Sequence, residues 1–254
     1  MIPSCPRFYA MLVLISVQCL SAEAKEAPNI QLNEVSVALP SREVALSLVV
    51  FTTKDFTVRV IDNSSEKDAS KYPDLATAMT ENGCVAGCNG GFFSRKPFAP
   101  VGGMISNGIT VSRVNRHTWM KGLLVVRQGQ PALELVDAFD SNTGITELLQ
   151  SGTWLVREGK SETDNSRDKI ARRTFIGHDA YGRWFLGASS PCTLHELAAA
   201  LRAPEVHAVI DVQSALNLDG GPSTGLWLKQ SPEDYYLQEL WPDRNYVGIV
   251  PRSK

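Results

Sequence analysis

The sequence has few of the features that point to a membrane protein or a nucleic-acid-binding protein. Its longest apolar run extends from Phe8 to Leu20 and is interrupted by Ser16 and Gln18, whereas a bilayer-spanning helix needs about 20 apolar residues. The formal net charge is only −2, and a nucleic-acid-binding surface normally requires an excess of basic residues. We therefore expect no stable membrane span and no nucleic-acid partner.

The N-terminal apolar run is typical of an export signal. Arg7 precedes the run, and Ala22-Glu23-Ala24 supplies small residues for cleavage. We therefore expect a signal peptide at residues 1–24 and an exported mature chain, 25–254, in the periplasm or outside the cell. Lipid attachment at Cys19 is the second alternative, but Val17 and Gln18 are poor residues before a lipidation site.

Cysteine and histidine are also scarce. Removing the signal leaves only Cys84, Cys88 and Cys192. In an oxidising compartment we predict a Cys84–Cys88 disulfide, because a Cys-x-x-x-Cys metal site would need further ligands. Cys192 is predicted to be a buried free thiol. The four histidines show no metal-ligand spacing.

The pattern of residues predicts a single α/β domain of the mixed α+β type, with a central mixed β-sheet and few helices. The chain has 254 residues, 43% of them hydrophobic, and shows no internal repeat, so it can bury one sizeable core. Segments 44–51 and 56–61 read as a hairpin, as do 175–177 and 184–188. Helices are expected at 73–82 and, from a capping-box pattern, at 193–201. Further strands are expected at 123–126, 133–136 and 154–157.

The stretch from Ala215 to Gly225 looks like the mouth of an active site. Leu216 and Leu218 alternate with Asn217 and Asp219, as in a half-buried strand, and Gly220 and Gly221 then allow a sharp turn. A carboxylate at such a position can hold a metal, exchange a proton or bind a sugar hydroxyl, while Ser223 and Thr224 add hydroxyl groups. An ordinary turn between two strands is the alternative.

A second glycine-rich stretch begins at Cys88. Asn89 can donate and accept hydrogen bonds to a hydroxylated ligand, Gly90 and Gly91 permit close approach, and Phe92 offers a stacking face for a sugar ring. Another glycine-rich passage follows at 100–108. A hairpin with two core phenylalanines is the alternative reading.

Taken together, these motifs resemble the phosphodiester glycosidase family, in its exopolysaccharide-related bacterial branch. The resemblance rests on Asn-Gly-Gly-Phe-Phe at 89–93 and Leu-Asn-Leu-Asp-Gly-Gly at 216–221. Weaker matches follow the family order at 149–152, 171–177 and 244–249. One departure is Pro222, at a position where the family often has a third glycine, because proline has no amide hydrogen to bind an anion.

The resemblance implies an exported hydrolase that cleaves a sugar-1-phosphodiester, in an envelope or extracellular glycan. Asp219 is then the expected catalytic carboxylate or the ligand of a divalent cation, Asn89 orients the substrate, and Arg173 binds the phosphate, with Arg172 as the alternative. The expected substrate-binding residues are Gly90, Gly91, Phe92, Ser151, Gly152, Gly220, Gly221, Ser223 and Thr224.

Two other functions fit the same residues. One is a metal-dependent phosphodiesterase or transferase that acts at phosphorus on the same scaffold. The other is a noncatalytic glycan-binding protein. A glycosidase with two carboxylates would need a second acid near Asp219, and the sequence does not identify one.

Overall fold

The structure is a computed structural model that describes Met1 and residues 29–65, 69–162 and 169–252. Apart from Met1, the predicted signal peptide and its cleavage site lie outside the described residues. No helix among the described residues is long and apolar enough to cross a membrane.

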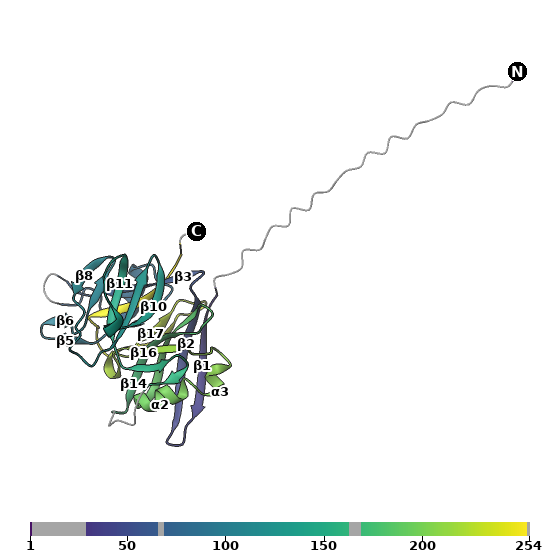
Figure 1. The fold of residues 1–254 in the computed structure, drawn as a ribbon. Helices are drawn as coiled ribbons and strands as arrows, with labels where there is room; N and C mark the ends of the chain where they lie inside the picture. The colour runs from purple at the N-terminus through teal and green to yellow at the C-terminus, as the bar shows by residue number, and fades with distance from the viewer. Residues whose placement is uncertain (2–28, 66–68, 163–168, 253–254) are drawn as a thin grey trace.

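Strands dominate the fold, and they form three larger sheets and one small hairpin (Figure 1). The seven-stranded sheet has the order β1 (Ile30–Ala38), β2 (Glu43–Thr52), β15 (Arg183–Cys192), β14 (Ala171–His178), β16 (Ser214–Asn217), β12 (Trp154–Arg157) and β13 (Lys160–Ser161).

Two five-stranded sheets complete the β structure. The first has the order β10 (Gln130–Leu135), β9 (Gly122–Arg127), β11 (Ile145–Ser151), β7 (Met104–Ser106) and β8 (Ile109–Ser112). The second has the order β18 (Tyr235–Leu237), β17 (Leu226–Leu228), β4 (Ala86–Asn89), β19 (Asn245–Pro251) and β3 (Phe56–Asp62). The small hairpin joins β5 (Phe93–Arg95) and β6 (Phe98–Pro100).

The main hydrophobic core lies between the three larger sheets. Each sheet contributes fully buried aliphatic side chains to it, for example Leu216 from β16, Leu124 from β9 and Val247 from β19. Burial of such side chains contributes roughly 1.5–3 kcal/mol each. The mostly β composition with few helices confirms the predicted fold class. In place of one central mixed sheet, however, the chain forms several sheets whose described strand pairs run antiparallel.

The helices are short and cover the outer faces of the sheets. Helix α1 (Leu75–Glu81) begins after Asp74, whose carboxylate accepts a hydrogen bond from the Thr77 amide. Helix α2 (Leu194–Ala200) has the predicted capping box between Thr193 and Glu196, and α3 (Pro204–His207) follows it. In Figure 1, α2 and α3 lie beside the seven-stranded sheet, away from the β5–β6 hairpin. The 3-10 helices are η1 (Val136–Ala138) and η2 (Gly221–Ser223).

One predicted hairpin is wrong. Segments 44–51 and 56–61 do form consecutive strands, but β2 pairs with β1 and β15 whereas β3 pairs with β19 in another sheet. Both strands bury apolar side chains in the same core, so packing between sheets takes the place of pairing within one. The second predicted hairpin, β14–β15, is confirmed.

The predicted Cys84–Cys88 disulfide is also wrong, because both thiols are free and buried. Cys88 packs in the main core, whereas Cys84 packs with Met79 and other residues under α1. Burial raises the pKa of Cys84 to about 12 and raises that of Cys88 as well. Cys192 is a buried free thiol, as predicted.

Candidate active site

The two motifs that stood out in the sequence meet in space, at the ends of strands from different sheets. Asn89 ends β4, and its side-chain amide donates to the Asp219 carbonyl at 2.8 Å. The side-chain oxygen of Asn89, Oδ1, accepts hydrogen bonds from the Thr174 hydroxyl at 2.7 Å and from the Gly225 amide at 3.1 Å. Because Asn89 is fully buried, its side chain fixes the Asp219 backbone against β14 and the segment before β17.

Gly90 and Gly91 are required for close packing of this junction. The Gly90 carbonyl accepts the Asp219 amide at 2.9 Å. A Cβ at Gly90 would lie 2.0 Å from the side-chain oxygen of Asn245, which instead accepts the Gly91 amide at 2.7 Å. These contacts give the glycines a role in the scaffold, and their predicted contact with substrate stays a prediction.

Asp219 follows β16 by two residues and lies at the entrance to η2. Its carboxylate accepts hydrogen bonds from the Gly220 amide at 2.8 Å and from the Ser223 hydroxyl at 3.0 Å. Gly221 adopts a φ of 61°, which favours glycine because a Cβ is strained there. Burial raises the pKa of Asp219, while the two hydrogen bonds and the Arg95 charge oppose that effect.

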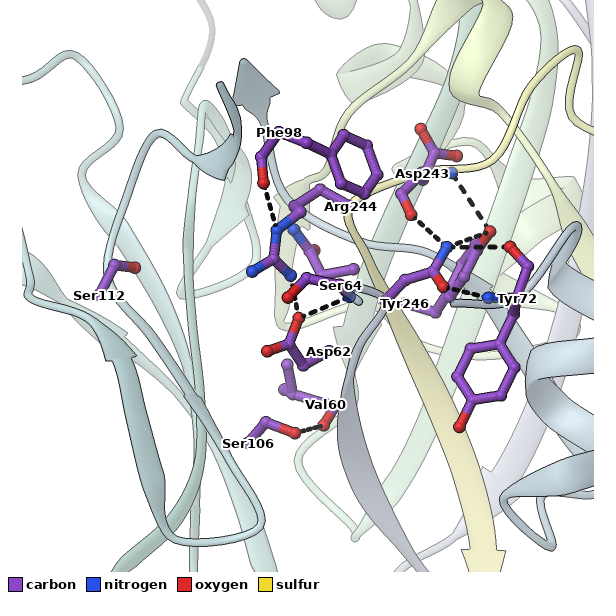
Figure 2. A network of polar contacts seen from close by, with 12 residues as sticks. Val60, Asp62, Ser64, Tyr72, Phe98, Ser106, Ser112, Asp243, Arg244 and Tyr246 are labelled. Carbon is purple, nitrogen blue, oxygen red and sulfur yellow. Dashed lines mark hydrogen bonds and ion pairs between the residues drawn. The ribbon is translucent and has the colours of Figure 1, made fainter. Parts of the chain in front are cut away.

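A second carboxyl group lies beside Asp219, and the sequence did not reveal it. Asp243 precedes β19; its amide donates to the Tyr246 hydroxyl at 3.2 Å, and its carbonyl accepts from the Asn63 side chain at 2.7 Å. Figure 2 shows the Asp243 carboxyl group turned away from these backbone bonds. Asp243 is only 2% exposed, and neither carboxyl oxygen has a hydrogen-bond partner among the described residues.

The surroundings of Asp243 favour its protonated form. Burial raises its pKa to about 8, and the negative charges of Asp219 and Glu239 add to this effect, against the opposing influence of Ser223 and Arg95. Glu239 itself is held by the Leu75 amide at 2.6 Å and the Tyr236 hydroxyl at 2.9 Å. The two neighbouring carboxyl groups therefore differ in their environment. Asp219 accepts hydrogen bonds from the Gly220 amide and the Ser223 hydroxyl, whereas neither Asp243 oxygen accepts a bond of normal geometry from the described residues and the nearby Ser223 hydroxyl only moderates its pKa. Such differences separate acid from base in hydrolases.

Arg95 supplies a positive charge that acts on both carboxyl groups. It belongs to β5, and its guanidinium lies 3.5 Å from the centre of the Trp241 ring. The pKa values of Asp219 and Asp243 are both raised by burial, and the positive charge of Arg95 opposes that effect. A guanidinium stacked on an aromatic ring keeps its planar set of donors available to a phosphate. Neither Arg95 nor Trp241 belongs to a sequence motif that we recognised.

Several buried polar atoms in the segment that contains Asp219 have no hydrogen-bond partner within the described ranges. In the described part of the chain, these side-chain atoms are Asn217 Oδ1, Thr224 Oγ1, Trp241 Nε1 and both carboxyl oxygens of Asp243. Each such atom costs roughly 1–3 kcal/mol unless a ligand or water completes it. All of them come from residues 217–243, the segment that contains Asp219.

Ser151 and Gly152 are hydrogen-bonded to Asn217, the last residue of the strand that leads to Asp219. The Ser151 hydroxyl donates to the Asn217 carbonyl at 2.8 Å, and the Gly152 carbonyl accepts from the Asn217 side chain at 3.0 Å. The structure therefore brings both predicted residues to the end of β16. A contact of either residue with substrate stays a prediction.

The two candidate arginines point to different places. Arg173 donates to the Cys192 carbonyl at 3.0 Å and also to the Lys169 carbonyl. The carbonyl of Arg172 lies against Gly220, and its guanidinium reaches the Gln238 carbonyl, next to Glu239. The two guanidinium groups are therefore held by different backbone carbonyls, and phosphate binding by Arg173 stays a prediction.

The structure offers limited support for a metal at Asp219. Across residues 29–65, 69–162 and 169–252, no group of three or more His, Cys, Asp and Glu side chains is arranged to hold a metal ion. The divalent cation remains a prediction.

Comparison with known proteins identifies the family of the chain. The family model described as phosphodiester glycosidase matches residues 82–250, which include both motifs and Asp243. The chain belongs to the phosphodiester glycosidase family.

Two animal relatives of this family member carry the name N-acetylglucosamine-1-phosphodiester alpha-N-acetylglucosaminidase. The protein from Bos taurus is 26% identical over 196 residues, and that from Mus musculus is 26% identical over 199 residues. These alignments cover 66% of this chain but only 36% and 37% of the relatives, so the chain spans little more than a third of their length.

Solved structures share the fold. The zebrafish N-acetylglucosamine-1-phosphodiester alpha-N-acetylglucosaminidase catalytic domain, auto-inhibited by its pro-peptide, superposes with a TM-score of 0.64 at 20% identity, covering 91% of this chain and 85% of that chain. A hypothetical protein from Synechocystis gives a TM-score of 0.59 at 14% identity, covering 89% and 64%.

Proposed function

We propose that the protein is an exported hydrolase that cleaves a sugar-1-phosphodiester, with N-acetylglucosamine as the first sugar to test. The observation that carries the proposal is the buried, unpartnered carboxyl group of Asp243 beside the hydrogen-bonded carboxylate of Asp219. Family membership supports the reaction class, and the names of the animal relatives supply the candidate sugar.

The two carboxyl groups are suited to different steps of glycoside cleavage. Asp243, with a pKa of about 8, is protonated at neutral pH and can donate its proton to the leaving phosphate oxygen. Asp219 accepts two hydrogen bonds that favour its ionised form, so it can stabilise positive charge at the sugar carbon or activate the attacking group. This division follows the two-carboxylate scheme of glycosidases.

Arg95 is the proposed partner of the phosphate. Its positive charge acts on both carboxyl groups, so an anionic substrate placed between them would meet a cation there. Stacking on Trp241 at 3.5 Å limits the motion of the guanidinium and lowers the entropy lost when phosphate binds. Arg172 is the second candidate for this role.

The test is hydrolysis of an N-acetylglucosamine-1-phosphodiester by the mature chain, 25–254, with and without chelator. We expect release of free sugar, and a loss of turnover of roughly 10²–10⁴-fold in Asp243→Asn and in Asp219→Asn. The exposed residue Asp140 offers a matched control, because Asp140→Asn makes the same chemical change away from the site.

The outcomes separate the alternatives. Chelator sensitivity would add the divalent cation, and oxygen from labelled water found in phosphate would identify a phosphodiesterase acting at phosphorus. Turnover that persists in Asp243→Asn would refute the assignment of the acid. A folded protein that binds glycans without turning over any sugar phosphodiester would be a binding protein.

A further inference from the structure

An exposed tryptophan packs against Phe92 of the Asn89 motif and has no role in the proposed chemistry. Trp119 lies in the loop between β8 and β9 and is 58% exposed. Its ring packs edge to face against Phe92, with ring centroids 4.8 Å apart and an interplanar angle of 74°. The pair therefore presents aromatic surface to solvent.

The loop that carries Trp119 is held in place by a buried side chain. Gln150 is 1% exposed; its oxygen accepts the amides of Gly103 and Asn115, both at 2.8 Å. Its nitrogen donates to the carbonyls of Asn115 at 2.7 Å and Met120 at 2.9 Å. A buried amide that satisfies four backbone groups fixes the loop on both sides of Trp119. The exposure of the ring is therefore set by the fold.

The loop also contacts the segment that leads to Asp219. A Cβ at Gly152 would lie 3.0 Å from the Met120 Cα, so the residue after Trp119 packs directly on Gly152. The Gly152 carbonyl in turn accepts a hydrogen bond from Asn217, two residues before Asp219.

Phe92 is connected to the second carboxyl group in a similar way. It follows Gly91, whose amide donates to the Asn245 side chain at 2.7 Å, and Asn245 is two residues after Asp243. The two rings are thus linked to the two carboxyl groups through different strands. We propose that Trp119 and Phe92 form a subsite that stacks on a further sugar residue, so that the substrate is a glycan chain and not a single sugar diester.

Carbohydrate is the occupant that this surface fits. The aliphatic face of a pyranose packs on an aromatic ring, while its hydroxyl groups need polar neighbours. Asn115 and His117, two exposed polar residues of the loop that carries Trp119, can supply such neighbours. That a sugar phosphodiester bond is cleaved beside this subsite rests on the proposed function.

The experiment is calorimetric titration of the mature protein with tetrasaccharides of N-acetylglucosamine, glucose, mannose and galactose. At least one should bind, and Trp119→Ala should weaken that binding about tenfold or more, whereas Trp119→Phe should keep most of it. Binding should also change tryptophan fluorescence in the wild type, and this change should be largely lost in Trp119→Phe. The matched control is Tyr181→Ala, which removes a ring that is 83% exposed in the β14–β15 turn and should leave affinity unchanged.

The same titration separates this inference from the proposed function. Equal affinity in wild type and Trp119→Ala, or no binding of any tetrasaccharide by the wild type, overturns the subsite. Binding that depends on Trp119 in a protein without turnover supports the subsite and refutes the hydrolase. If the protein hydrolyses the small diester but binds the tetrasaccharide equally well with and without the Trp119 ring, only the subsite is refuted.

Discussion

Asp243→Asn should make the protein more stable at neutral pH while removing its proposed acid. The folded protein holds the Asp243 proton up to a pKa of about 8, whereas the unfolded chain releases it near 4. Between these values the folded state binds one more proton than the unfolded state, so the wild-type free energy of unfolding falls as pH rises. Asparagine at position 243 has no such proton, so the free energy of unfolding of Asp243→Asn lacks this dependence on pH.

The expected magnitude follows from one proton per molecule. Each pH unit in this window changes the free energy of unfolding by about 1.4 kcal/mol. The advantage of Asp243→Asn over wild type should therefore grow by about 2.7 kcal/mol between pH 5 and pH 7, and should level off above pH 8. This difference in slope does not depend on any constant cost of placing an amide in the site.

Urea denaturation of both proteins at pH 5, 6, 7 and 8 measures this difference. Asp140→Asn, an exposed substitution, should give a curve parallel to wild type. Parallel curves for Asp243→Asn as well would show that Asp243 is ionised in the folded protein, and would refute its assignment as the acid.

Three further predictions concern other parts of the site and core. Arg95→Gln should lower kcat/KM about 10–100-fold, as expected for the loss of one charge-assisted contact, and Arg95→Lys should recover part of it; equal kcat/KM in all three proteins would exclude a phosphate role. Asn89→Ala should lower the free energy of unfolding by about 3 kcal/mol in a denaturant titration, because its three hydrogen bonds are lost and buried partners remain; a change under 1 kcal/mol would contradict this account of Asn89. A thiol reagent at pH 8 should leave Cys84 and Cys88 unlabelled in the folded mature chain, because both thiols are buried and have raised pKa values. After unfolding without reductant, both should be labelled. Labelling of Cys192 alone in the unfolded chain would indicate a Cys84–Cys88 disulfide.

Local patterns predicted the elements of the fold better than their partners. The capping box at Thr193 and the hairpin of β14 and β15 depend on residues close in sequence, and both are confirmed. The pairing of β3 with β19 joins residues far apart in the chain. It depends on how three sheets share one core, and alternation within a single strand carries no information about that choice.

The same distinction explains which site residues the sequence could reveal. Asn89, Gly90 and Gly91 stood out because the junction needs an amide of that shape and two residues without a Cβ, and such needs leave a motif. Their polar groups are bonded within the protein, so these residues hold the site together, and a direct role of any of them on substrate stays a prediction. The candidates for the chemistry are the hydrogen-bonded Asp219 carboxylate and the Asp243 carboxyl group, whose oxygens have no hydrogen-bond partner among the described residues.

Asp243 belongs to no motif that we recognised in the sequence. Its position is set by its backbone, through the amide that donates to Tyr246 and the carbonyl that accepts from Asn63. Its pKa is set by burial and by the carboxylates of Asp219 and Glu239. These three groups come together only when β16, β18 and β19 have been placed by the fold, so the motif at Asp219 can locate the site while the acid beside it is found only in three dimensions.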